Sequence, residues 1–375
     1  MGYFFRKFKN KAKKILVSIC CWFIPFSKSR KNFRKKFLDN YRGNCKLSLN
    51  KKTWNKILKP ENFQLQRGNF LLFDYEYPKY SENPLNIGDY LQTLAVKNAL
   101  DAVFHNNNYS FFDRDNLTNY NGPGRILCVM QGWFSHTSNF LPNNKILPVY
   151  VGTHFCEKAH NLLESVFNSK EGKTFTQNLE IGCRDNFTLE FCRKNSVNSY
   201  LSRCLTLTFR KRSRHSGQNK IFTVEFPEEL HSYLPREIKE NTEYISHYKP
   251  GIRVDGRNCA QTLLNRYRDE AKLVITDKLH CASPCIAMGI PVVLIKTDSE
   301  QSSRFSTLDN IIKIYEISDL KNRSIDYDAK VLDIEDLKKD MLANLELSVK
   351  KATGENVDLN ELAQIRSRIA SFSLF

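Results

Sequence analysis

The chain has 375 residues, which is long enough for two domains with separate cores and further extensions. Its 41% hydrophobic and 26% charged residues are ordinary for a globular protein. The net charge of +17 would suit nucleic-acid binding, but residues 1–44 hold 13 Lys/Arg and one acid, Asp39, a net of +12. The other 331 residues therefore carry only +5, which argues against nucleic acid as a partner of the folded body.

The basic segment at the N-terminus, residues 1–44, surrounds an apolar centre, ILVSICCWFIPF, of 12 residues. This centre is shorter than the roughly 20 residues of a membrane-spanning helix, and no signal-peptide or myristoylation pattern is present. Aromatic and aliphatic residues between lysines and arginines favour an in-plane anchor on an anionic membrane. A solvated basic tail is the alternative. We therefore expect a cytoplasmic protein that is peripheral on the inner face of the cytoplasmic membrane.

Eleven cysteines are scattered along the chain without a CxxC motif or a zinc-type cluster. This pattern is typical of reduced thiols in a cytosolic protein, most of them buried as small hydrophobic residues. Cys281 and Cys285 share one helix face at i,i+4 spacing, which leaves metal ligation open for this pair. We expect no metal site and no cofactor.

The first half of the body alternates strands and helices. We expect a strand at 69–77, a helix at 90–100 capped by Asp89, strands at 125–133 and 146–155, a strand and helix within 179–195, and a strand at 202–209. The polar run 210–219 is the best candidate for an interdomain linker.

A second series follows the linker, with the segments 220–226, 242–250, 260–271, 272–295 and 309–317, and residues from about 328 onward look helical. The pattern predicts an α/β protein with two Rossmann-like domains, similar to glycosyltransferases of the B type, and an interdomain cleft. The expected domains are 1–44, 45–212, 213–330 and a helical extension at 331–375. Ligands of such sheets bind beyond the carboxyl ends of the strands.

The segment 272–295, KLVITDKLHCASPCIAMGIPVVLI, reads as strand, turn, helix and strand. It places Lys278 and His280 at the mouth of a helix, where unpaired backbone N–H groups favour an anion. Lys278 adds a charge suited to phosphate or carboxylate, and His280 can change its protonation state near neutral pH. The alternative is a histidine packed against the other domain and a solvated lysine.

Three further strand ends carry polar residues or glycine, and each is weak evidence on its own. For the arginine among them, the alternative is an ordinary surface residue. All fall at the expected ligand-facing end of the sheets. The residues are Arg184, the loop residues Asn86, Gly88 and Asp89, and Gln131 and Gly132 before Trp133.

The order NIGD, QGW, IGCRDNFTLEFCRKN, SRCLTLTF and TDKLHCASPCIAMGIPVVLI resembles the polysaccharide pyruvyl transferases over roughly residues 70–310. The resemblance implies transfer of a pyruvyl ketal group from phosphoenolpyruvate, as donor substrate, to a sugar or lipid-linked oligosaccharide acceptor. It assigns donor binding to Arg184, Lys278 and His280. The family usually has arginine at the place of Lys278, and lysine cannot form a bidentate fork to an anion.

Within this chemistry, His280 is the best candidate for proton transfer, and no second acid or base stands out. Two other functions fit the same pattern. A glycosyltransferase would use the basic helix mouth for a sugar nucleotide, and a non-catalytic scaffold of surface-polysaccharide synthesis would need no intact donor site.

Overall fold

The computed structural model describes residues 55–57, 65–75, 85–135, 137–176, 179–213, 217–249, 255–297 and 302–375. The expected membrane-contact segment, residues 1–44, lies outside the described residues. Within the described ranges, no helix is both long enough and apolar enough to cross a membrane.

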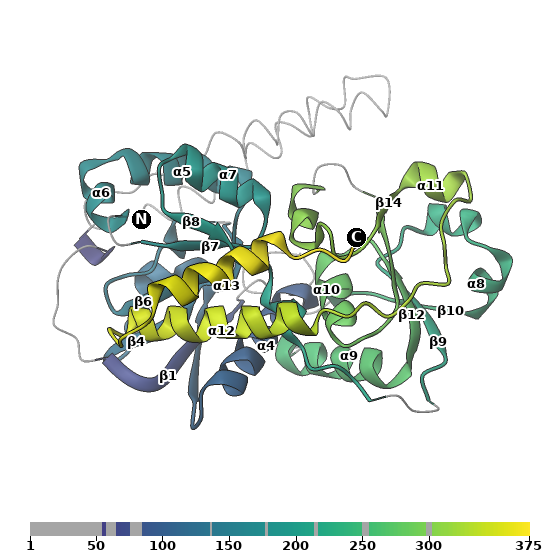
Figure 1. Cartoon of the computed structure of the whole chain (residues 1–375), viewed down its shortest axis with the longest axis horizontal. Coiled ribbons are helices and arrows are strands. Elements are labelled where there is room, and N and C mark those ends of the chain that lie inside the picture. Colours follow the sequence, from purple (N-terminus) through teal and green to yellow (C-terminus); the bar gives the residue numbers. More distant parts are fainter. Residues whose placement is uncertain are drawn as a thin grey trace, which may run out of the picture. The chain divides into compact units, whose positions relative to one another are not determined.

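The first sheet is parallel and has the strand order β3-β1-β4-β6-β7-β8, with β5 paired to β6 (Figure 1). Its strands are β1 (Leu65–Asp74), β3 (Asn108–Asp113), β4 (Arg125–Val129), β5 (Gly132–Phe134), β6 (Ile146–Phe155), β7 (Ile181–Cys183) and β8 (Ser199–Leu201). The apolar runs of β4 and β6 are buried along most of their length, as expected of strands covered on both faces.

The helical segments of this half are α4 (Ile87–Val103), η2 (Arg114–Asn119), η3 (Ser138–Phe140), α5 (Glu157–Asn168), α6 (Lys170–Thr176), α7 (Asn186–Lys194) and η4 (Leu205–Thr208), where η marks a 3-10 helix. The predicted strand at 202–209 is wrong. β8 ends at Leu201, and the apolar residues of η4 are buried against α4 and α10 rather than in a strand pair. The predicted cap of α4 is also wrong, because Asn86 occupies that position and Asp89 lies in the first turn.

The second sheet is also parallel, with the order β10-β9-β12-β13-β14. Its strands are β9 (Lys220–Val224), β10 (Thr242–Ile245), β12 (Ala271–Thr276), β13 (Val292–Lys296) and β14 (Ile314–Glu316). Its helical segments are η5 (Glu228–Tyr233), α8 (Arg236–Asn241), α9 (Gly256–Glu270), α10 (Leu279–Ala287), η6 (Ser302–Leu308) and α11 (Ile317–Lys321). Two parallel sheets with alternating helices confirm the predicted α/β class with two Rossmann-like halves.

The last part of the chain returns to the first sheet. The last two helices, α12 (Glu335–Ala352) and α13 (Leu359–Ser371), pack against each other (Figure 1). α12 contacts α4 and β6, and α13 contacts β8, so both helices cover the first sheet. The boundaries at residues 212 and 330 remain a proposal.

A short antiparallel pair fixes the loop before α4. β2 (Leu85–Asn86) pairs with β11 (Tyr248–Lys249), and the Ile87 N–H donates to the His247 carbonyl at 2.8 Å. Because β11 follows β10 of the second sheet, this pairing holds the start of α4 against residues of the second half.

Candidate functional site

The NIGD loop opens α4 directly beside His280. The Asn86 side-chain oxygen accepts from the Gly88 N–H at 3.0 Å, and its Nδ2 donates to Asp89 at 3.4 Å. A Cβ on Gly88 would lie 3.4 Å from His280 Nδ1 and 3.0 Å from the Asn86 oxygen. The glycine therefore lets the imidazole approach the first turn of α4.

Asp89 extends the loop into a buried chain of polar contacts. Its Oδ1 accepts from Gln92 Nε2 at 3.1 Å and lies 3.6 Å from Nη1 of the buried Arg114. Gln92 in turn accepts from Arg184 Nη1 through its Oε1 at 3.2 Å. The predicted residues Asp89 and Arg184, far apart in the sequence, are thus connected through one intermediate side chain.

Arg184 follows β7 and is fully buried, so the interpretation of a surface arginine does not hold. Besides Gln92, its Nη1 donates to His280 Nε2 at 3.4 Å, and its Nε donates to Asp185 Oδ2 at 3.4 Å. Its Nη2 is buried and has no hydrogen-bond partner among the described residues. A buried guanidinium with an open N–H group favours an anionic ligand, because an unpaired charged donor is costly to bury.

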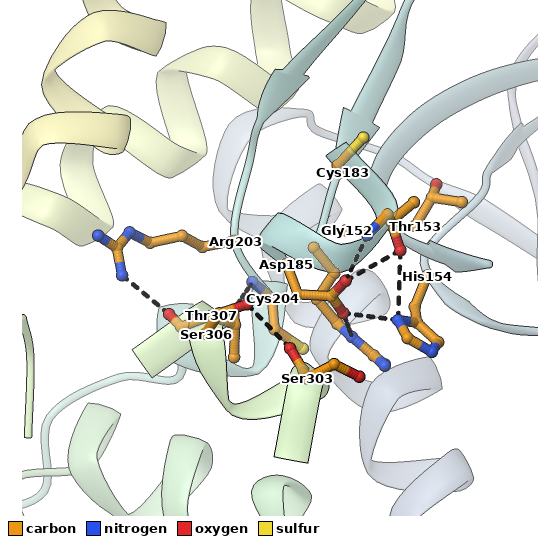
Figure 2. A network of polar contacts seen from close by, with 12 residues as sticks. Gly152, Thr153, His154, Cys183, Asp185, Arg203, Cys204, Ser303, Ser306 and Thr307 are labelled. Carbon is orange, nitrogen blue, oxygen red and sulfur yellow. Dashed lines mark hydrogen bonds and ion pairs between the residues drawn. The ribbon is translucent and has the colours of Figure 1, made fainter. Parts of the chain in front are cut away.

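Asp185 caps α7 and also holds a histidine that the sequence analysis missed (Figure 2). His154 lies at the end of β6, and its Nδ1 is 2.6 Å from Asp185 Oδ2. Burial and the charge of Arg184 lower the pKa of His154 to about 4, against the pull of Asp185. Burial raises the pKa of Asp185, but His154 and Arg184 outweigh it and hold that pKa at about 2. The pair is therefore a neutral imidazole donating to a carboxylate at neutral pH.

His280 lies in the first turn of α10 and is partly buried. Burial lowers its pKa well below the usual range, and the charges of Arg184 and Arg304 act in the same direction. Since Nε2 accepts from Arg184, the proton of the neutral ring lies on Nδ1. The free protein thus presents His280 as a neutral imidazole beside a buried cation.

Arg304 is a further cation of this region that the sequence analysis did not identify. It lies on η6 and is partly buried, and its guanidinium has no hydrogen bond or ion pair to another described residue. Burial and the charge of Arg184 lower the pKa of Arg304, while Asp89 and Asp185 raise it. No motif marks Arg304, because η6 does not follow a strand-to-helix turn of the kind that carries Arg184 and His280.

Lys278 occupies the N-cap position of α10, but its Nζ contacts its neighbour in sequence. The ammonium lies 3.1 Å from Asp277 Oδ1 and 3.2 Å from Oδ2. Its side chain is about one-third exposed, at 32%. The structure thus places Lys278 at the helix mouth without a contact to Arg184 or His280 among the described residues.

Gln131 and Gly132 have packing contacts in the structure. Gln131 is buried, and its Oε1 accepts from the Leu205 N–H at 2.7 Å, which joins β4 to η4. Gly132 faces the side chain of Arg114, the partner of Asp89. Within the described ranges neither residue contacts Arg184 or His280, so their link to a ligand stays a prediction.

The described cysteines are all free thiols, and Cys281 lies 3.5 Å from the Tyr267 hydroxyl. Among the described residues, no group of three or more His, Cys, Asp or Glu side chains is arranged to hold a metal ion.

Comparison with known proteins identifies the family of this α/β protein. The sequence model of the polysaccharide pyruvyl transferase family matches residues 86–299, more than half of the chain, and includes the NIGD loop, Arg184 and His280. The chain therefore belongs to the polysaccharide pyruvyl transferase family. It is a transferase of a family whose reaction is pyruvyl transfer to polysaccharides.

Three solved structures show more distant likeness. An uncharacterised protein from Klebsiella pneumoniae is 13% identical, with 64% of this chain and 87% of that chain covered and a TM-score of 0.37. A protein described as a UDP-N-acetylglucosamine 2-epimerase from Listeria monocytogenes is 10% identical, with 77% of this chain and 97% of that chain covered and a TM-score of 0.33. A protein described as the glycosyltransferase of kitacinnamycin is 8% identical, with 83% of this chain and 95% of that chain covered and a TM-score of 0.26. No curated protein matches this chain.

Proposed function

We propose that this protein transfers a pyruvyl group from phosphoenolpyruvate to a sugar of a cell-surface polysaccharide or its lipid-linked precursor, forming a cyclic ketal. The main support is the pairing of Arg184, with its buried open N–H group, and the neutral imidazole of His280. An anionic donor would satisfy the guanidinium and lie within reach of the imidazole.

Donor binding falls to Arg184, the mouth of α10 and Lys278. The first turn of α10 has no side-chain cap. The Cys281 N–H donates to the Lys278 carbonyl, and among the described residues the N–H groups of Leu279 and His280 are left open to an anion. Lys278 would add its charge if the ammonium turned away from Asp277. Asn86, Gly88 and Asp89 shape the opposite wall, and Asp89 holds Gln92, which positions Arg184. Gln131 and Gly132 would act indirectly, Gln131 by accepting from the Leu205 N–H and Gly132 by packing against Arg114.

The chemistry needs a proton on the methylene carbon of the donor and two new bonds to its central carbon. His280, neutral in the free protein, accepts the proton of the first sugar hydroxyl and delivers it to the methylene carbon, which becomes a methyl group. The hydroxyl oxygen bonds to the central carbon. Phosphate then leaves, the second hydroxyl oxygen takes its place, and the proton of that hydroxyl departs with phosphate. Cations around the phosphate stabilise the charge of the leaving group.

A donor-binding screen separates this function from a glycosyltransferase with the same kind of fold. We expect phosphoenolpyruvate to raise the melting temperature of the protein, because a ligand that binds only the folded state stabilises it. UDP-sugars should produce no shift at the same concentration. Stabilisation by UDP-sugars without any by phosphoenolpyruvate would contradict the proposal.

The basic segment 1–44 is proposed to attach the enzyme to the inner face of the cytoplasmic membrane, near lipid-linked acceptors. Deleting residues 1–44 should abolish co-sedimentation with anionic vesicles at low salt while donor binding is kept. Vesicles of neutral lipid are the control. Full-length protein that does not sediment with anionic vesicles would contradict the anchor.

A further inference from the structure

Hydrogen bonds hold η6, the segment that carries Arg304, to the chain next to Arg184 and to the start of η4. The Ser306 hydroxyl accepts from the Asn186 N–H at 2.9 Å, at the start of α7 and two residues after Arg184. The Thr307 hydroxyl accepts from the Cys204 N–H at 3.1 Å. Figure 2 shows Ser303, Ser306 and Thr307 beside Asp185 and Cys204. The backbone of Arg304 is therefore held against the segment that positions Arg184.

Phe305, Thr307 and Leu308 of η6 are buried, whereas Arg304 is only partly buried. Phe305 and Thr307 are 6% and 0% exposed. These buried side chains anchor η6, and the guanidinium of Arg304 has no hydrogen bond or ion pair to the residues that the structure describes.

The charge of Arg304 acts on the same groups as the charge of Arg184. Its charge lowers the pKa of both His154 and His280, and the charge of Arg184 lowers its own. Two guanidinium groups thus repel each other across the site. The two carboxylates whose charges raise the pKa of Arg304 have other partners, since Asp185 contacts His154 and Asp89 contacts Gln92. This arrangement is stabilised by a ligand with more than one negative group.

We propose that Arg304 is a second donor-binding guanidinium, which holds one of the two anionic groups of the donor while Arg184 holds the other. The inference rests on the proposed function, in which the donor, phosphoenolpyruvate, carries a carboxylate and a phosphate.

Calorimetric titration of the full chain with phosphoenolpyruvate, inorganic phosphate and pyruvate tests this proposal. Arg304→Gln should raise the dissociation constant of phosphoenolpyruvate at least tenfold, about 1.4 kcal/mol. Arg304→Lys, which keeps the charge, should raise this dissociation constant by less. Arg304→Gln and Arg184→Gln should each weaken a different one of the two single-anion probes. Arg236→Gln, on the exposed face of α8, is the matched control and should bind like the parent.

The outcomes separate this inference from the proposed function. If Arg184→Gln loses phosphoenolpyruvate and Arg304→Gln binds it like the parent, the role of Arg304 is wrong and the function stands. If both variants weaken the same single-anion probe, the two arginines hold one group and the division of labour is wrong. If the parent does not bind phosphoenolpyruvate at all, the proposed function is overturned together with this inference.

Discussion

Replacing His280 with glutamine should lower turnover by about 10²- to 10⁴-fold, the usual contribution of a general acid–base group. Glutamine is polar and of similar reach, but it cannot accept and return a proton near neutral pH. Donor affinity should change far less, because Arg184 and the mouth of α10 remain. The measurement is phosphate release from phosphoenolpyruvate with a sugar acceptor, together with donor binding by calorimetry.

The pH dependence gives a second readout of His280. Because its pKa lies well below the usual value, the neutral form persists in the free enzyme at pH values where an ordinary histidine is protonated. The kcat/KM of the parent should therefore hold as pH falls to about 6.5 and decline only below that, when the imidazole gains a proton. The decline caused by His280 should be absent from the residual activity of the glutamine variant. Full turnover in that variant would show that His280 is a packed histidine without a role in proton transfer.

Arg203→Met should lower the free energy of unfolding by about 3 kcal/mol or more, since buried carbonyl groups left without a donor each cost about 1–3 kcal/mol. Arg203 is 1% exposed. Its guanidinium donates to four backbone carbonyls on two segments, those of Thr307, Asp309, Ile369 and Phe372. The side chain thus joins the end of β8 to η6 and to the end of α13. Methionine keeps much of the volume but none of the donors.

Urea denaturation of the parent and the variant measures this effect. Arg210→Met, at an exposed position further along the same segment, is the matched control and should change stability by less than about 0.5 kcal/mol. If Arg203→Met lowers the free energy of unfolding no more than the control does, the four hydrogen bonds contribute little to stability.

Strand ends were the part of the site that could be predicted. A run such as IGC followed by Arg184 and a capping aspartate has a local signature, and parallel sheets bring their carboxyl ends to one edge. His154 carries the same signature at the end of β6 and could have been found in this way. The burial of Arg184 could not be predicted, because it depends on Gln92 and His280, which are distant in sequence.

Other features of the site depend on tertiary contacts without any local pattern. Asn86 and Asp89 are both good caps, and only the pairing of β2 with β11 sets the start of α4 at Ile87. The alternating residues of η4 look like a strand, but α4 and α10 bury them as a 3-10 helix. The segment η6, which carries Arg304, is held to α7 by the bond from the Asn186 N–H to the Ser306 hydroxyl, and no spacing in the sequence indicates this contact.

The most direct test of the central claim is to incubate the purified full-length protein with phosphoenolpyruvate and a lipid-linked or nucleotide-linked sugar acceptor, and to analyse the products by mass spectrometry and NMR. The account predicts an acceptor whose mass has risen by one pyruvate less one water, with a ketal methyl signal, and one phosphate released for each product formed. In deuterated water the new methyl group should carry solvent deuterium, because its third hydrogen comes from the first sugar hydroxyl through His280. An acceptor that instead gains a sugar from a nucleotide donor, with phosphoenolpyruvate left intact, would contradict it.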